Sequence, residues 1–392
     1  MKRARRLAQV PDYPFARWGQ ACREAAERGL DLIRLDAGSP DLPPPERVVE
    51  ALCDAARRPS SHGYSGYRGT EALRNGIAAY YERRFGVSVD PDREVLPLIG
   101  SKGGIVELQL ATLDPGDAVL APNPGYAPYS AGAHLADATI VPFALDAARG
   151  YLPDFDAIPS RDAQRASVLW LNYPNNPTGA TATNSDLASA VAFAREHDLL
   201  LCHDAPYTDV WYEGDPPPSV LQVPGAIDVA VEFNSLSKTF NMAGWRLGTV
   251  VGRNDVIETL ARIVSNIDSG ILTPIQEAAA TALETDAVWI AERNAVYRDR
   301  LRILHESLVS IGLSTEVPRA TLYLWAQLPL GIAAEALARR LLNETGISIA
   351  PGTFFGPAGE GYVRLSATQP TERIQEVAER LAVLPRDWVQ AS

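Results

Sequence analysis

Short apolar runs alternate with amphipathic stretches along most of the 392-residue chain. The runs are bounded by Gly, Pro, Asn or Asp, as is typical of buried strands. We expect strands at residues 31–35, 118–120, 168–171, 199–204, 229–233, 247–251, 320–325 and 361–366, and a strand, a glycine-rich turn and a helix within 94–113. We expect further helices at residues 18–30, 46–57, 184–197, 288–310 and 333–345, and one beginning near residue 274. Strands that alternate with helices predict an α/β fold with a wound parallel sheet.

Composition narrows the class of protein. The formal charge of -12 argues against nucleic acid or an anionic membrane surface as the main partner. The start of the chain lacks the apolar core of a signal peptide and no run is long enough to span a membrane, so we expect a cytoplasmic protein. Cys22, Cys53 and Cys202 lack metal-ligand spacing, so we expect buried free thiols and no metal.

One lysine stands out because this chain uses lysine sparingly. Only three residues are lysine among the 36 that are lysine or arginine. Lys238 follows a strand-like run, with Ser235 and Ser237 beside it and Arg246 eight residues on. Arginine cannot form a Schiff base because its guanidinium stays protonated, whereas lysine can once its pKa is lowered. The stretch therefore predicts an anion-binding corner that presents an amine.

This stretch resembles a known motif. Ser235-Leu-Ser-Lys238 followed by Gly244-Trp-Arg246 is similar to the cofactor-lysine motif of the fold-type I, pyridoxal phosphate-dependent aminotransferases of class I/II. The resemblance implies that Lys238 holds the cofactor as a Schiff base and then moves protons. It also implies that Ser235 and Arg246 bind the cofactor phosphate and that Ser237 is a further cofactor contact.

A second phosphate-binding element is expected at residues 94–104. A strand, a glycine-rich turn and the start of a helix follow one another there, and the free amides of a helix N-terminus suit a phosphate. The spacing is not that of a Walker A loop. In the family, Ser101, Lys102 and Gly103 correspond to the phosphate-cup triplet. Lys102 is also the rival for the Schiff base, but its place at this turn favours an electrostatic role.

The cofactor ring has four candidate contacts in the matching positions. Tyr126 corresponds to the aromatic residue that stacks on the ring, and Asn176 and Tyr207 to donors to its phenolic oxygen. Asp204 ends a buried strand, where a carboxylate costs several kcal/mol unless it has a partner; a protonated pyridine nitrogen is such a partner. Asp209 is the alternative acid, although the aromatic spacing fits Asp204 better.

Substrate contacts are expected from three segments. The proline-rich residues 36–45 should form a rigid crossing loop, in which Gly38 corresponds to the glycine that meets the substrate carboxylate. Arg364 lies in an apolar run and corresponds to the arginine that grips the α-carboxylate, a contact that suits the guanidinium fork. Asn176 is expected to contact the substrate as well as the cofactor.

The resemblance also implies a homodimer. Tyr64, with Tyr67 as its competitor, corresponds to the tyrosine that reaches the cofactor phosphate of the partner subunit. Residues 265–270 resemble a loop that in some members faces the neighbouring site. Members often carry a basic residue just before this loop, where this chain has Val264, so recognition of the distal part of the substrate stays open.

The resemblance thus implies a fold-type I transferase in two domains. Residues 45–285 are expected to form a large domain with a mostly parallel seven-stranded sheet, and residues 1–44 and 286–392 a smaller α/β domain. The expected reaction is ping-pong transfer of an amino group between an amino acid and a 2-oxo acid. Residues 235–248 and 265–270 most resemble those of two groups of aminotransferases: the LL-diaminopimelate group and the broad aspartate, alanine and aromatic group. A lyase or cyclase on the same fold, or a non-catalytic cofactor-sensing regulator, is the alternative.

Overall fold

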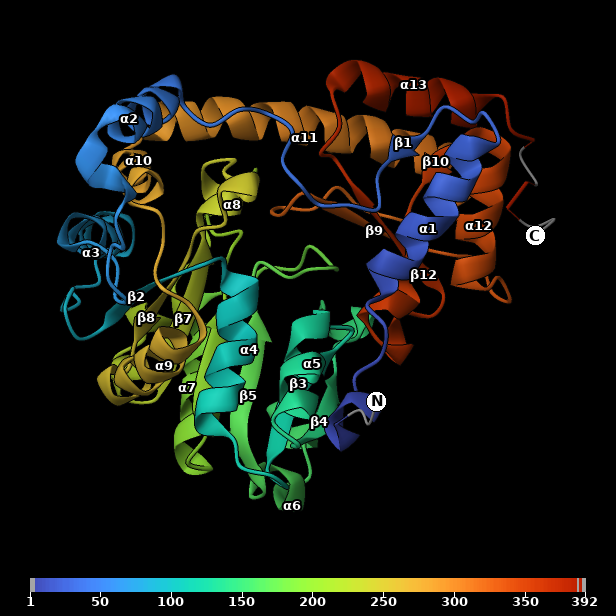
Figure 1. Cartoon of the computed structure of the whole chain (residues 1–392). Helices are drawn as coiled ribbons and strands as arrows, with labels where there is room; N and C mark the ends of the chain where they lie inside the picture. The colour runs from blue at the N-terminus through green and yellow to red at the C-terminus, as the bar shows by residue number, and fades with distance from the viewer. Residues whose placement is uncertain (1–3, 386–387, 390–392) are drawn as a thin grey trace.

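A seven-stranded sheet forms the centre of the larger part of the molecule in this computed structural model, which describes residues 4–385 and 388–389 (Figure 1). From edge to edge its strands are β2 (Val95–Leu98), β8 (Gly248–Gly252), β7 (Ala230–Ser235), β6 (Leu200–Asp204), β5 (Ala166–Asn172), β3 (Ala118–Asn123) and β4 (Thr139–Ala144). Six of the seven strands run in the same direction, and β8 runs opposite to them. The mostly parallel sheet expected from the sequence is therefore confirmed.

Helices cover both faces of this sheet. They are α2 (Glu46–Arg57), α3 (Glu71–Phe85), α4 (Ser101–Thr112), α5 (Ala127–Leu135), α6 (Ser160–Ala163), α7 (Asn184–Glu196), α8 (Leu236–Thr239), α9 (Asn254–Ile267) and α10 (Thr273–Leu283). Successive residues of a strand point to opposite faces, so Leu169 packs in the core under α3, α7 and α10 while Val168 and Trp170 pack under α4, α5 and α9. Strands buried on both sides explain the continuous apolar runs in the sequence.

The two ends of the chain build a second, smaller α/β unit. It contains the helices α1 (Pro14–Glu27), α11 (Ala287–Ser310), α12 (Ala334–Thr345) and α13 (Thr371–Ala382), and the strands β1 (Ile33–Arg34), β9 (Tyr323–Gln327), β10 (Ile347–Ser348), β11 (Ala350–Pro351) and β12 (Tyr362–Ser366). The order β11-β12-β9 is antiparallel, and β1 pairs with β10. Its core draws almost entirely on residues 18–35 and 297–389, which supports the division at 45 and 285 that we propose. The long helix α11 runs beside both parts (Figure 1).

Several predicted elements need correction. The first helix spans residues 14–27 rather than 18–30, since Pro14 begins it, and the strand expected at 31–35 shortens to β1. Residues 265–267 are the last turn of α9 and not a loop. The sequence pattern did not predict β4, an edge strand that is largely solvent-facing and is interrupted by Pro142, a residue that argues against a strand in a sequence pattern. It did not predict α13 either.

The cysteines are free, but only two of them match the expectation. Cys22 and Cys202 are buried, whereas Cys53 is exposed on α2, so the expectation of three buried thiols was wrong for Cys53. Within residues 4–385 and 388–389, no helix is long and apolar enough to cross a membrane. In the same part of the chain no three His, Cys, Asp or Glu side chains gather as they would around a metal ion.

Candidate active site

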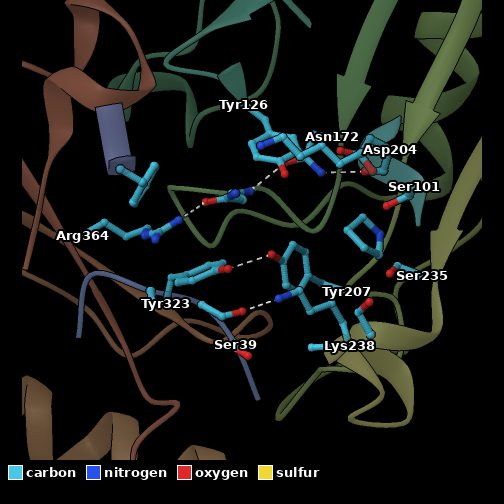
Figure 2. A pocket seen from close by; sticks show the side chains of 18 of the residues that line it. Ser39, Ser101, Tyr126, Asn172, Asp204, Tyr207, Ser235, Lys238, Tyr323 and Arg364 are labelled. Carbon is cyan, nitrogen blue, oxygen red and sulfur yellow. Dashed lines mark hydrogen bonds between the residues drawn. The ribbon is translucent and has the colours of Figure 1, made fainter. Parts of the chain in front are cut away.

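A cavity of about 480 Å³ lies between the large sheet and the small unit (Figure 2). Residues that directly follow β5, β6 and β7 line it, as expected because the carboxyl ends of parallel strands meet at one edge of a sheet. Of the predicted site residues, the cavity is lined by Gly38, Ser101, Lys102, Tyr126, Asn176, Asp204, Tyr207, Ser235, Ser237, Lys238, Arg246 and Arg364. Only Tyr64 and Gly103 do not line it.

Lys238 reaches the cavity from one turn beyond a strand. β7 ends at Ser235, and the lysine belongs to the short helix α8, not to the strand end itself. Its Nζ donates a hydrogen bond to the carbonyl oxygen of Gly38. Burial lowers the pKa of Lys238; Tyr323 acts in the opposite sense, and the charges of Arg364 and Arg246 add to the lowering. A lower pKa increases the fraction of neutral, nucleophilic amine.

The predicted anion-binding corner forms at the N-terminus of α4. Gly100 precedes this helix with φ +79°, and a Cβ there would lie 2.3 Å from Nη2 of Arg246, so glycine allows the guanidinium to approach the helix start. Ser101 and Ser235 line the same part of the cavity. Free helix amides, two hydroxyls and a guanidinium together suit a phosphate dianion.

Lys102 is the charged residue of the predicted phosphate triplet, and it also lines the cavity. Its Nζ lies 3.8 Å from the centroid of the Tyr13 ring, and burial, followed by the charge of Arg246, lowers its pKa. Gly103 belongs to the first turn of α4 and does not line the cavity.

Asp204 presents a buried oxygen atom without a partner. Its Oδ2 accepts a hydrogen bond of 2.7 Å from the Tyr129 hydroxyl, while Oδ1 has no hydrogen bond. Burial raises the pKa of Asp204 to about 6, against the lowering effects of Tyr129 and His203. The alternative acid, Asp209, is buried outside this cavity and pairs with Arg84 at 2.8 Å. A cationic N–H group in the cavity would satisfy Asp204 Oδ1 and compensate its charge, so the site fits a protonated pyridine nitrogen.

Arg364 is a buried cation whose hydrogen-bond partners are all neutral. Nη1 donates to Oδ1 of Asn176 at 2.8 Å, and Nη2 donates to the carbonyl oxygen of Asp36 at 2.6 Å. Neither Asn176 nor the Asp36 backbone neutralises its charge. A buried guanidinium with an uncompensated charge is a strong site for a carboxylate. Because Oδ1 of Asn176 accepts from Arg364, its amide nitrogen is the group left to donate into the cavity.

Sequence reasoning missed several residues of the cavity. Tyr323 hydrogen-bonds Tyr207 through the two hydroxyl groups at 2.8 Å, and Tyr13 and Phe15 line the wall formed by the N-terminal segment. Tyr323 and the N-terminal pair lie in stretches without a distinctive motif. Asn172, in contrast, begins the motif that contains Asn176, and its amide donates 2.6 Å to the backbone oxygen of Asp204.

Tyr64 and Val264 lie away from the cavity of their own chain. The Tyr64 side chain is 90% exposed, and Tyr67 is also exposed, so a single chain does not decide between them. Val264 is buried in the core under α9. The position before residue 265 therefore packs inside the chain and does not line this cavity.

The class of protein follows from a family comparison. Residues 31–381 match the family described as aminotransferase class I and II, and the chain belongs to this family. It is a pyridoxal 5'-phosphate-dependent aminotransferase, which acts on amino acids and 2-oxo acids.

Particular relatives are also similar over nearly their whole length. LL-diaminopimelate aminotransferase of Moorella thermoacetica is 47% identical, with 97% of this chain and 98% of the relative covered. The apo-BacF structure from Bacillus subtilis is 35% identical with a TM-score of 0.94, covering 98% and 99% of the two chains. A probable N-succinyldiaminopimelate aminotransferase from Thermus thermophilus is 39% identical with a TM-score of 0.88, covering 94% and 98%. These relatives support amino transfer over the lyase, cyclase and regulator alternatives.

Proposed function

We propose that this aminotransferase exchanges an amino group between LL-diaminopimelate and a 2-oxo acid in a ping-pong reaction. The observation that carries the proposal is the 47% identity to an LL-diaminopimelate aminotransferase across 97% of the chain. A relative at 45% identity over the same share of the chain has the same name. The sequence also resembles the broad aspartate, alanine and aromatic group of aminotransferases. The amino acids used by those enzymes therefore serve as competing substrates in the assay.

The residues of the cavity fit pyridoxal phosphate in one orientation. Ser101, Lys102, Ser235 and Arg246 would hold the phosphate together with Ser237. Gly103 does not line the cavity, and its proposed contribution is through its backbone in the first turn of α4. Oδ1 of Asp204, which has no partner of its own, would accept from the pyridine nitrogen, Asn176 and Tyr207 would donate to the phenolic oxygen, and Tyr126 would pack against the ring. When bound, the cofactor supplies an electron-poor ring that stabilises negative charge at the substrate Cα.

The chain's own groups then do the remaining work. Arg364 holds the substrate α-carboxylate through its guanidinium fork, beside Gly38 and Asn176, and so fixes the direction of the Cα–H bond. Lys238 would hold the cofactor through its amine, and the same amine, when free and neutral, would take the proton from the substrate Cα as a general base. The lowered pKa of Lys238 favours the neutral amine that this step needs.

We also propose the homodimer, with Tyr64 reaching the cofactor phosphate of the partner subunit, and a cytoplasmic location. Two apolar side chains near residue 271 in the sequence have large exposed fractions: Ile267 is 57% and Leu272 is 50% exposed. The loop of Tyr64 is fixed beside this segment because the Ser65 hydroxyl donates 2.6 Å to the carbonyl of Ile271. An exposed apolar patch of this kind is typical of a subunit interface.

A substrate panel tests the proposed reaction. The purified holoenzyme is mixed with LL-diaminopimelate, meso-diaminopimelate, N-succinyl-LL-diaminopimelate, aspartate, alanine or phenylalanine, and the loss of its visible cofactor band and the formation of a 2-oxo acid are followed. We expect LL-diaminopimelate to react with the highest kcat/KM. A preference for the N-succinyl compound or for aspartate would refute the proposed substrate while leaving the class of reaction intact.

A further inference from the structure

Tyr323 occupies the centre of the cavity, between the two parts of the molecule. It comes from β9 of the small unit and is 3% exposed. Its hydroxyl group lies 2.8 Å from the hydroxyl of Tyr207, which follows β6 of the large sheet. Figure 2 shows the two hydroxyl groups pointing toward each other, with Arg364 on the side of Tyr323 and Lys238 on the side of Tyr207. This hydrogen bond joins the large sheet to the small unit inside the active site.

The ring of Tyr323 also supports the candidate carboxylate site. The guanidinium carbon of Arg364 lies 4.1 Å from the ring centroid, close enough for a cation–π contact. On β12, Arg364 is opposite Trp325, so it shares one face of the small sheet with Tyr323. The aromatic face and the two neutral hydrogen-bond acceptors together fix the plane of the guanidinium.

A third contact explains a sequence requirement nearby. A Cβ added to Gly38 would lie 2.0 Å from the Tyr323 hydroxyl oxygen. The carbonyl of Gly38 is the group to which Lys238 donates. Tyr323 therefore contacts the loop that receives the lysine, the arginine that faces the substrate and the tyrosine that faces the cofactor.

We propose that Tyr323 is a positioning residue of the aminotransferase reaction: its hydroxyl donates to Tyr207 and so directs the Tyr207 proton toward the cofactor, while its ring holds the Arg364 fork in place. This inference rests on the proposed roles of Tyr207 and Arg364. Tyr323 acts through these two residues and couples the cofactor side of the site to the substrate side.

Either hydroxyl can donate in this contact, so the charges around the two phenols decide the direction. Burial acts to raise the pKa of Tyr323, but the positive charges of Lys238 and Arg364 lower it; the hydrogen bond lowers it further only where Tyr207 is the donor. Burial raises the pKa of Tyr207 well above its usual value. When both phenols are neutral, the more acidic one is the better donor, and a phenol that accepts a hydrogen bond becomes a stronger donor itself.

The test separates the hydroxyl from the ring. Tyr323→Phe removes only the hydroxyl, and Tyr323→Leu removes the ring as well. Tyr362→Phe is the matched control, because Tyr362 lies on the same sheet face but lines no part of this cavity. The first readout is the pH midpoint of the visible-band change of the holoenzyme, which reports loss of a proton from the cofactor–lysine linkage. The second is the KM for the 2-oxo acid.

We expect Tyr323→Phe to raise the pH midpoint by about 0.5 to 1 unit, because a weaker donor at Tyr207 stabilises the phenolic oxygen less. Its KM should change less than about twofold, whereas Tyr323→Leu should raise KM about five- to tenfold. Tyr207→Phe should raise the midpoint further, and Tyr323→Phe in the Tyr207→Phe background should add no further shift.

Other results would show whether the inference about Tyr323 or the proposed role of Tyr207 is wrong. If Tyr207→Phe shifts the midpoint but Tyr323→Phe does not, or if the two shifts add, the inference about Tyr323 is wrong and the proposed site stands. If Tyr207→Phe itself leaves the midpoint unchanged, the proposed role of Tyr207 fails first. An unchanged thermal unfolding midpoint of the cofactor-free variants shows that the effects do not come from misfolding.

Discussion

Replacing Asp204 with asparagine removes a buried negative charge while keeping the shape of the side chain. In the cofactor-free protein this carboxyl group has a pKa raised from 3.8 to about 6, mainly by burial. A difference of about two pH units corresponds to about 3 kcal/mol of unfolding free energy. We therefore expect the cofactor-free Asp204→Asn variant to be more stable than the wild type at pH 8.

The sign follows from proton binding. The folded state binds this proton more tightly than the unfolded state, so the stability linked to protonation is complete below about pH 3.8 and is lost as the pH rises through about 6. The advantage of Asp204→Asn should accordingly be about 3 kcal/mol at pH 8 and about half of that at pH 5. The asparagine Oδ1 can still accept from Tyr129, so this hydrogen bond is preserved.

Urea unfolding of the cofactor-free proteins at pH 5 and pH 8 measures this difference. Comparing the two pH values cancels any constant effect of the substitution, and the exposed Asp156→Asn serves as the control for loss of a surface carboxylate. An Asp204→Asn variant that is no more stable at pH 8, or whose advantage is the same at both pH values, would refute the reasoning.

The same substitution should have the opposite consequence once the cofactor is bound. The cofactor's ring nitrogen then loses the negatively charged partner that we propose for it. Breaking a buried charge pair costs about 3 to 5 kcal/mol, which predicts a fall in kcat of at least about 100-fold. Steady-state rates at saturating cofactor measure this loss, and activity close to that of the wild type would exclude Asp204 as the partner of the ring nitrogen.

Four further substitutions test the other parts of the site. Lys238→Ala should bind the cofactor without the visible band of the lysine linkage, and its kcat should fall at least about 10⁴-fold; a normal band would transfer the role to another amine. Arg364→Lys should lower kcat/KM for the 2-oxo acid about 100-fold with little change in the cofactor spectrum, because the fork is lost. Gly38→Ala should lower the free energy of unfolding by about 1 to 3 kcal/mol, measured by urea denaturation, since its Cβ meets Tyr323. Mixing inactive Lys238→Ala and Tyr64→Ala subunits should restore about a quarter of the wild-type activity. Half of the dimers should then be mixed, and one of the two sites in each mixed dimer has both an intact lysine and an intact tyrosine from the other subunit. No recovery after subunit exchange would contradict the proposed interface.

The sequence predicted much of the site because its residues follow strand ends. Asp204 is the last residue of β6, and Asn176 and Lys238 lie within four residues of the ends of β5 and β7. Parallel strands bring such positions to one edge of a sheet. A local motif therefore carried three-dimensional information. The same reasoning explains why the order of apolar runs was enough to predict a mostly parallel sheet, while the exposed edge strand β4 escaped it.

Other parts of the site have no local signature. Tyr323 lies in a run of buried residues. Nothing in residues 320–325 indicates that its hydroxyl meets Tyr207, 116 residues earlier in the chain. Tyr13 and Phe15 precede and begin a helix whose pattern predicts only packing. The exposed Cys53 shows the same limit for burial, because one residue of an amphipathic helix does not reveal which face is covered.

By itself, the sequence determined the strand and helix alternation, the loops that carry the cofactor-binding groups and the lysine that can form a Schiff base. Only the tertiary structure decided which of two acids, Asp204 or Asp209, faces the cavity, and it did so by giving Asp209 a partner in Arg84. It also placed Tyr323 between the substrate and cofactor sides. Periodicity records which side of an element is buried, but contacts between distant segments depend on how the elements pack, and that information is distributed over the whole chain.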